Sequence, residues 1–359
     1  MVSICIVIFS VFICGFGLIY LNRSNAKIAS GQKMETASKK AVSLPKEPAL
    51  ENKNIGFFFA GDVMLDRYIL TIAQRRGAGF LTEKMQSLFS GPDEIVFNLE
   101  GPVTKNNSVS KETLIGDKDN MRFTFDANVT RNFLQSSRAN SVFIGNNHIL
   151  DFGKDGLAET ESFFRANNFS YFGDANAQNE PLTKEINNKK VAYVAFNKFL
   201  GEDARSVGEK VRQLKKTNDF VVVYAHWGIE YAKTASDKQK EQAHQFIDAG
   251  ADLIIGSHPH VVEPVEIYKN KAIFYSLGNL VFDQYFSPET TEGLAVVVSV
   301  KNDNLDFYLL PLSLNHDGST TLSEGKNKND LLFWLAENST VSDKLKNSIK
   351  SGHFQIEKK

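Results

Sequence analysis

Seven polar residues follow short apolar runs of the sequence, at points where a strand would end. They are Asp62, Glu100, Asn147, His148, His226, His258 and His260. The carboxyl ends of strands in an open α/β sheet border one crevice, so these side chains are expected to converge. Imidazole, carboxylate and amide-oxygen ligands together suit a divalent ion such as Zn, Mn or Fe. A carboxylate that reaches two ions could bridge them, as in two-metal hydrolases.

Each of these residues also has an ordinary interpretation. Gly61-Asp62 is typical of a turn or a helix cap, and Asn146-Asn147 of a turn. A single histidine such as His226 is usually a hydrogen-bonded core or surface residue. Ser257-His258-Pro259-His260 is different, because a turn bent by proline can aim both imidazoles inward. Repeated coincidence at successive strand ends favours a metal or catalytic cluster.

The elements that must position these residues alternate between apolar runs and helical stretches. Strands are predicted at 55–60, 94–97, 141–144, 191–196, 220–225, 252–255 and 271–275. Helices are predicted at 69–75, 157–167, 207–216 and 237–249, with a short one at 331–336. Runs 294–300 and 305–310 flank Asn302-Asp303-Asn304 and predict a hairpin. The alternation predicts an α/β fold with a largely buried, mixed sheet.

The N-terminal segment from Val2 to Leu21 contains no charged residue. About 20 helical residues span a hydrocarbon layer of about 30 Å, so residues 1–22 are predicted to be a transmembrane anchor. A cleaved signal peptide is the alternative, although no Lys or Arg precedes the run. The cations that follow the run would favour the cytoplasmic side, which conflicts with an exported domain and leaves orientation open. Residues 23–54 are predicted to be a flexible tether, 55–315 the folded domain and 316–359 a C-terminal extension.

Composition excludes several classes of protein. The net charge of −1 gives no indication of a nucleic-acid binder. Cys5 and Cys14 are the only cysteines and both lie in the N-terminal apolar run, so the rest of the chain has neither a disulfide nor a cysteine ligand.

Several segments together resemble the poly-γ-glutamate biosynthesis family called CapA or PgsA, which is grouped with calcineurin-like metallophosphoesterases. They are the segments 61–67 (GDVMLDR), 98–104 (NLEGPVT), 146–153 (NNHILDFG), 225–231 (AHWGIEY), 250–261 (GAD through SHPHV) and 274–283 (FYSLGN with VFD). They occur in the family's order over residues 55–312, and their combination is specific although each alone is not.

The resemblance implies a metallophosphoesterase-like sandwich of two mixed sheets flanked by helices. It implies that Asp62 is the first metal-binding aspartate and that Glu100 stands at the bridging carboxylate. It also implies that Asn147, His226, His258 and His260 are further metal ligands. His148 would protonate a leaving group.

One position departs from the phosphoesterase pattern. Those enzymes carry a histidine two residues after the first aspartate, and this chain has Met64. A thioether is a poor ligand for a hard ion, so one metal site is expected to be weak or empty unless Asp66 compensates. This, and the lack of a phosphate-binding arginine cluster beyond Arg67, argues against ordinary phosphoesterase activity.

Five further residues have two interpretations each. Asp151 and Glu230 would either orient histidines or be solvated loop charges. Asn279 would line the pocket or form a turn, and Trp227 and Tyr231 would contact substrate or pack in the core or rim.

The leading hypothesis is a membrane-anchored component of capsule or poly-γ-glutamate synthesis or export, with a divalent-metal site and a domain outside the cytoplasm. Expected partners are the lipid bilayer, capsule synthase subunits and an anionic polymer, with no nucleic acid. Two alternatives remain open, a metal-dependent hydrolase or phosphoesterase of the cell envelope and a non-catalytic scaffold. Whether the protein is an enzyme is therefore undecided by the sequence.

Overall fold

The computed structural model describes residues 54–113, 117–175 and 180–358. The predicted anchor at 1–22 and all but the last residue of the predicted tether lie outside these residues. Among the described helices, none combines the length and apolar character needed to cross a membrane.

The first sheet is mixed, with strand order β14-β13-β12-β1-β2-β3-β4. Strand β11 pairs with β1, and β15 pairs with β13. The strands of this sheet are β1 (Ile55–Val63), β2 (Glu94–Leu99), β3 (Ser141–Phe143), β4 (Ser170–Phe172), β11 (Asn279–Val281), β12 (Glu292–Val300), β13 (Asn304–Leu314), β14 (Thr320–Leu322) and β15 (His353–Glu357). Strands β1 to β4 run parallel, whereas β12 is antiparallel to both β1 and β13.

The second sheet is also mixed, with strand order β5-β6-β7-β8-β10-β9. Its strands are β5 (Leu182–Ile186), β6 (Lys189–Asn197), β7 (Phe220–His226), β8 (Leu253–Ser257), β9 (Val265–Tyr268) and β10 (Lys271–Phe274). The inner strands β6, β7 and β8 are parallel, and β5 and β9 are antiparallel edge strands.

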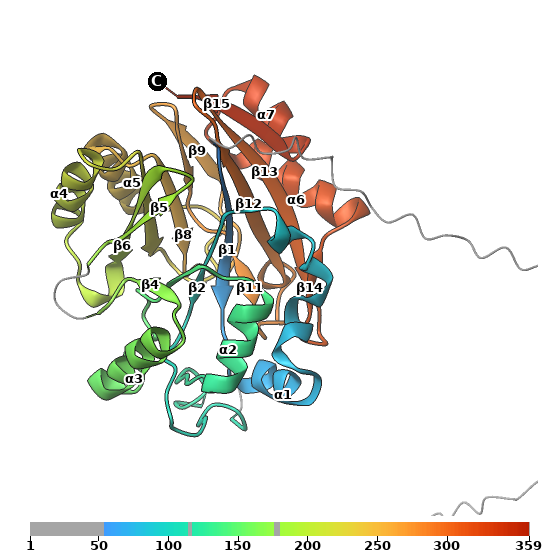
Figure 1. The fold of residues 1–359 in the computed structure, drawn as a ribbon. Coiled ribbons are helices and arrows are strands. Elements are labelled where there is room, and N and C mark those ends of the chain that lie inside the picture. The colour runs from blue at the N-terminus through green and yellow to red at the C-terminus, as the bar shows by residue number, and fades with distance from the viewer. Residues whose placement is uncertain (1–53, 114–116, 176–179, 359) are drawn as a thin grey trace, which may run out of the picture. The chain divides into compact units, whose positions relative to one another are not determined.

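Helices flank the two sheets (Figure 1). They are α1 (Arg67–Arg76), α2 (Ala127–Ser136), α3 (Gly153–Ala166), α4 (Ala204–Lys215), α5 (Asp237–Ala249), α6 (Gly325–Asn338) and α7 (Asp343–Lys350). Short 3-10 turns occur at η1 (Ala78–Met85), η2 (Leu88–Ser90), η3 (Lys198–Leu200) and η4 (Glu289–Thr291). Helices α1, α2 and α3 pack on the first sheet, and α4 and α5 pack on the second.

The period of a strand explains how β1 serves two cores. Phe57 and Phe59 point between the sheets, while Phe58 and Ala60 point toward the helices on the outer face. Phe57 stacks on Phe220 of the second sheet at 5.6 Å between ring centroids. An uninterrupted apolar run, rather than an alternating one, is therefore what this doubly covered strand requires.

The predicted strands all form, and the structure confirms the predicted α/β fold of two mixed sheets with helices. The transmembrane helix predicted to precede this fold lies outside the described residues. The hairpin is β12–β13, and the helix predicted at 237–249 has the same bounds in the structure as α5. Helices α2 and α7 were not predicted. The predicted C-terminal extension, residues 316–359, supplies β14, α6, α7 and β15 to the first sheet and its core.

Strand register brings the polar strand ends to the same level. Asp62 of β1 lies opposite Asn98 of β2 on one side and Asn279 of β11 on the other. In the second sheet, His226 lies between Asn197 and Ser257. Tyr224 of β7 links the sheets, because its hydroxyl donates to the carbonyl of Ala60 at 2.8 Å.

Gly61 allows the backbone before Asp62 to approach a neighbouring loop. A Cβ atom at residue 61 would lie 1.8 Å from the carbonyl oxygen of Gly278. The amide of Asp62 donates to this same carbonyl at 3.0 Å. Because there is no room for a Cβ atom, residue 61 must be glycine.

We expect Gly61→Ala to lower the free energy of unfolding by about 1–3 kcal/mol or more, because backbone must move to admit the methyl group. The matched control is Gly208→Ala in α4, where the nearest atom to a new Cβ is 3.8 Å away. That change should leave stability unchanged or raise it by about 0.5–1 kcal/mol through helix propensity. Urea unfolding of both variants tests this, and equal stability would contradict the close approach.

Candidate metal centre

The seven residues singled out from the sequence lie at the carboxyl ends of strands from both sheets. Asp62 is the penultimate residue of β1, and Glu100 follows the last residue of β2 directly. Asn147 and His148 lie in the loop after β3, His226 ends β7, and His258 and His260 follow β8. All are buried except Asn147, which is half-buried.

Two groups of three side chains are close enough to hold one ion each, and they share Glu100. Glu100, His226 and His258 form the first triad, and Asp62, Glu100 and His260 form the second. In each triad the ligand atoms lie within 4.8 Å of one another. The sequence prediction that distant segments meet at one rim is therefore confirmed in space, while the role of each residue as a ligand stays a prediction.

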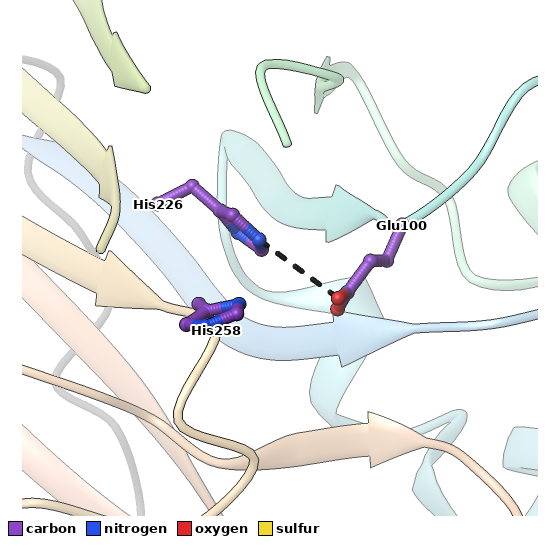
Figure 2. A group of neighbouring side chains, drawn as sticks. All are labelled: Glu100, His226 and His258. Atoms are coloured by element: carbon purple, nitrogen blue, oxygen red, sulfur yellow. Dashed lines mark ion pairs between the residues drawn. The ribbon is translucent and has the colours of Figure 1, made fainter. Parts of the chain in front are cut away.

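In the first triad, the Glu100 carboxylate points toward the two imidazoles (Figure 2). Its Oε1 is 3.8 Å from Nε2 of His226. Asn147 belongs beside this triad, because its Oδ1 is 2.7 Å from the same Nε2. Oε1 of Glu100 and Nδ1 of His258 are buried and have no hydrogen-bond partner within residues 54–113, 117–175 and 180–358. Such buried orphan groups are unfavourable unless something else satisfies them.

The second triad holds its carboxylates around one imidazole. His260 Nδ1 is 3.4 Å from Oδ2 of Asp62, and its Nε2 is 3.6 Å from Oε1 of Glu100. The backbone amide of His258 donates to the same Asp62 oxygen at 3.1 Å. The turn that carries both histidines is thereby tied to β1.

Burial and mutual repulsion set the protonation of the cluster in the absence of an ion. Burial, reinforced by Asp62, raises the pKa of Glu100 well above its usual range. Burial disfavours charge on His260, but Glu100 and Asp62 outweigh it and raise its pKa to about 9. Burial and the neighbouring histidines lower the pKa of His226 and bring that of His258 to about 3. Neutral imidazoles are the form that binds metal.

A second layer of side chains orients the ligands. Asn98 Nδ2 donates to Asp62 Oδ1 at 2.8 Å and approaches Glu100 Oε2 at 3.4 Å. Ser257 Oγ lies 2.9 Å from Nδ1 of His226. Asn98 and Ser257 were not predicted as site residues. Their positions in the sequence could have indicated this role. Asn98 stands two residues before Glu100, and Ser257 is the last residue of the strand before His258.

Two of the residues with open interpretations also position histidines. Asp151 Oδ2 lies 2.9 Å from Nδ1 of His148, which confirms the orienting role. Asn279 Oδ1 lies 3.0 Å from Nδ1 of His260. Glu230 contacts no ligand histidine in the described structure and lies instead close to Tyr231.

The aromatic residues near the site differ in exposure. Trp227 is fully buried and donates to the carbonyl of Tyr275 at 2.9 Å, so it is a core residue. Tyr231 is 41% exposed and lies 6.2 Å from the ring of His260. Phe199, which the sequence did not single out, is 42% exposed and covers His258 at 4.2 Å.

The turn after β8 holds its histidines in an uncommon backbone conformation. His258 has φ of 97° and His260 has φ of 58°. A left-handed conformation at a residue with a Cβ costs about 1–3 kcal/mol and is concentrated at functional sites. The strain is the local means by which two imidazoles two residues apart face the same space.

Met64 and Asp66 are both buried but belong to neither triad. The sulfur of Met64 accepts a hydrogen bond from the amide of Asp66 at 3.0 Å. The Asp66 carboxylate caps α1 through the amide of Arg67 at 2.7 Å and accepts from the amide of Thr124 at 2.9 Å. The structure thus gives Asp66 a helix-capping role, and Asp66 does not group with the candidate ligands of either triad.

The donor set fits a divalent cation. It combines buried carboxylate oxygens, neutral imidazoles and one amide oxygen, which suits zinc, manganese or iron. The unpartnered Glu100 Oε1, common to both triads, is the atom that an ion would satisfy. The second triad offers three protein ligands, and Met64 adds none of the hard donors that such an ion prefers.

Sequence comparison matches the chain to a family described as "Bacterial capsule synthesis protein PGA_cap", over residues 56–284. The PGA biosynthesis protein CapA of Bacillus subtilis (strain 168) is 30% identical over 76% of this chain and 74% of its own length. The capsule biosynthesis protein CapA of Bacillus anthracis is 27% identical over 81% of this chain and 75% of its own length. Among solved structures, a predicted phosphoesterase from Streptococcus pneumoniae TIGR4 covers 75% of this chain and 97% of its own, at 10% identity and a TM-score of 0.28. A score this low carries no argument about the present chain.

Glu100→Gln keeps the shape of the shared ligand and removes its charge. In chelator at pH 8, we expect it to raise the free energy of unfolding by about 1–3 kcal/mol, because it removes a carboxylate buried beside Asp62. Because burial raises the folded-state pKa of Glu100, its contribution to stability is full below the unfolded-state pKa of about 4.3. The contribution is lost as pH rises from there through the higher folded-state pKa, so the difference between the variants grows with pH over that interval. Mn²⁺ or Zn²⁺ should reverse the order, since it stabilises only the wild type by mass action.

The control is Glu263→Gln. Burial raises the pKa of Glu263 to about 8, and this residue is in neither triad. Its variant should gain stability at pH 9 but keep the full response to metal. A wild type that is more stable than Glu100→Gln in chelator at pH 8 would mean that the cluster is compensated without an ion. Denaturant titrations at several pH values give all of these quantities.

Proposed function

Because the chain belongs to the bacterial capsule synthesis protein PGA_cap family, whose signature matches more than half of it, we propose that it is a metal-dependent component of capsule polymer synthesis. The observation that supports metal dependence is the sharing of Glu100 between two buried triads of possible ligands. The two relatives are named as capsule or PGA biosynthesis proteins. We therefore include in the proposal that this protein acts in the synthesis of the same kind of polymer.

The proposed chemistry is hydrolysis or transfer at an acyl or phosphoryl bond. Asp62, Glu100, Asn147, His226, His258 and His260 would hold the ions, and these would polarise the scissile group and lower the pKa of a bound water. His148 is suited to donate a proton to the leaving group. It is nearly buried, and when Nδ1 donates to Asp151 at 2.9 Å the ring is fixed with Nε2 available.

A non-catalytic scaffold is the second candidate, and Met64 favours it. A centre that lacks one histidine holds its ion in the second triad less firmly, and the Met64 sulfur is already bonded to a backbone amide. The protein would then bind capsule synthase subunits as a scaffold, with the metal ion, if one is bound, stabilising its structure. A metal-dependent phosphoesterase unrelated to capsule is the third candidate.

We further propose that the folded domain works at the cell envelope, outside the cytoplasm. The support is the uncharged N-terminal run of the sequence, which lies outside the described residues. Reaction of an impermeant label with the described domain in intact cells, compared with lysed cells, tests this localisation.

Elemental analysis of the purified full-length chain tests the metal centre. Asp62→Ala should lose about one equivalent from the second triad, and His258→Ala about one equivalent from the first. His244→Ala is the control, because His244 pairs with Glu266 and stacks on Tyr268, away from both triads. Folded wild type that carries no stoichiometric metal under any loading condition would remove the proposal.

Turnover separates the enzyme candidates from the scaffold. Metal-loaded protein is assayed with phosphodiesters and with γ-glutamyl peptides. For an enzyme, His148→Gln should lower kcat by about 10²–10⁴-fold while leaving metal content unchanged. Turnover of phosphodiesters alone favours the third candidate, and full metal occupancy without turnover of either substrate favours the scaffold.

A further inference from the structure

A cavity of about 500 Å³ adjoins the metal centre and has no part in the chemistry described above. Arg67, Tyr68 and Lys111 line one part of it, and Tyr231, Tyr285 and Phe286 line another. Its volume is in the range of small-molecule sites in proteins. Tyr231 joins the cavity to the centre, because its hydroxyl accepts from Gln284, which accepts from Asn279 beside His260.

Arg67 lies one aromatic ring away from both His148 and His260. Its guanidinium carbon is 5.0 Å from the ring centre of Phe123 and 5.5 Å from that of Phe282. Phe123 packs on His148 at 4.3 Å, and Phe282 packs on His260 at 4.8 Å. The positive group is therefore held at a fixed place beside the reacting space.

The hydrogen bonds of Arg67 are incomplete although the residue is only 8% exposed. One terminal nitrogen pairs with Asp283, while the other has long contacts with Asn120, at 3.4 and 3.5 Å, and with the sulfur of Met121 at 3.8 Å. The Nε atom of Arg67 is buried and has no hydrogen-bond partner among the described residues. Arginine with φ of 48° is also an uncommon conformation, held by the Asp66 bond to its amide. An arginine kept in place, with a terminal nitrogen that makes only long contacts, is suited to an incoming anion.

The lining of the cavity carries a net positive charge. Arg67 and Lys111 oppose a single carboxylate, Asp283, among the lining residues. The Lys111 ammonium has a neutral partner, the amide oxygen of Gln74 at 3.1 Å. Its charge is therefore not matched by that contact.

The rim is unusually apolar for a charged cavity. Eight large hydrophobic residues of the described chain are exposed, and four of them line this cavity: Tyr68, Met121, Tyr231 and Phe286. Exposed apolar groups that cluster, rather than scatter, mark a binding surface. Aromatic walls beside cations fit a ligand whose carboxylates are carried on methylene stems.

We infer that this cavity binds a carboxylate-bearing segment of an acidic polypeptide, with Arg67 and Lys111 receiving its carboxylates and the aromatic rim packing on its methylenes. The inference deepens the proposed function, on which it rests for the nature of the polymer. In this inference, Arg67 and Lys111 are binding residues that position the bound polypeptide beside the two triads.

The test is direct binding to the full-length protein, without any need for turnover. The probes are a fluorescent γ-linked glutamate oligomer of about ten residues, its neutral glutamine counterpart and inorganic phosphate. Lys111→Gln should weaken oligomer binding about three- to tenfold and Arg67→Lys about tenfold or more, since each removes a charged hydrogen bond. Lys105→Gln, an exposed lysine outside the cavity with the same charge change, should bind as the wild type does.

The outcomes separate this inference from the proposed metal centre. Metal content and thermal unfolding are measured on each variant, so that loss of binding through unfolding is recognised. Oligomer binding that is equal in wild type, Lys111→Gln and Arg67→Lys would overturn the inference, as would equal binding of the neutral oligomer. Displacement of the oligomer by equimolar phosphate would reassign the cavity to phosphate and also overturn it. Stoichiometric metal without oligomer binding refutes the cavity alone, whereas oligomer binding without metal refutes the metal centre alone.

Discussion

Two carboxylates buried together with three imidazoles are the constraint on which the rest of the structure depends. Asp62 and Glu100 are fully buried, and one Glu100 oxygen accepts no hydrogen bond from the part of the chain that the structure describes. Charges in such surroundings are costly unless a partner of opposite sign is present. Without an ion, the cluster responds by holding protons, which is why the pKa of His260 reaches about 9. The fold supplies a charged space whose side chains could hold a cation.

The two sheets meet this constraint by delivering ligands from opposite sides. The first sheet contributes Asp62 and Glu100, and the second contributes His226, His258 and His260. Neither sheet alone carries a complete triad. The core between the sheets, including Phe57 against Phe220, therefore sets the distance between ligands as well as the stability of the domain.

The sequence predicted this arrangement where local pattern and chemistry agree. Apolar runs such as 55–60 end in a polar residue, and parallel pairing aligns such ends, so the convergence of ligands followed from strand order alone. The cavity around Arg67 could not be predicted, because it is lined by loop residues at 110–113, 120–121 and 283–286 that have no periodicity. Strand β15 was also missed, because its pairing with β13 depends on contacts nearly 50 residues apart in the chain. The capping role of Asp66 was missed for a related reason, since only the structure shows the amide of Thr124 donating to its carboxylate.

The turn after β8 has a consequence for how this protein changes over evolutionary time. The left-handed backbone at His258 and His260 is energetically unfavourable for histidine, whereas asparagine or glycine adopts this conformation at lower cost. If the site needs imidazole nitrogens, that need would retain histidine against this conformational cost. A lineage released from ion binding should therefore drift at these two sites before it drifts in the surrounding sheet, and the identity of both residues records whether the chemistry is still in use.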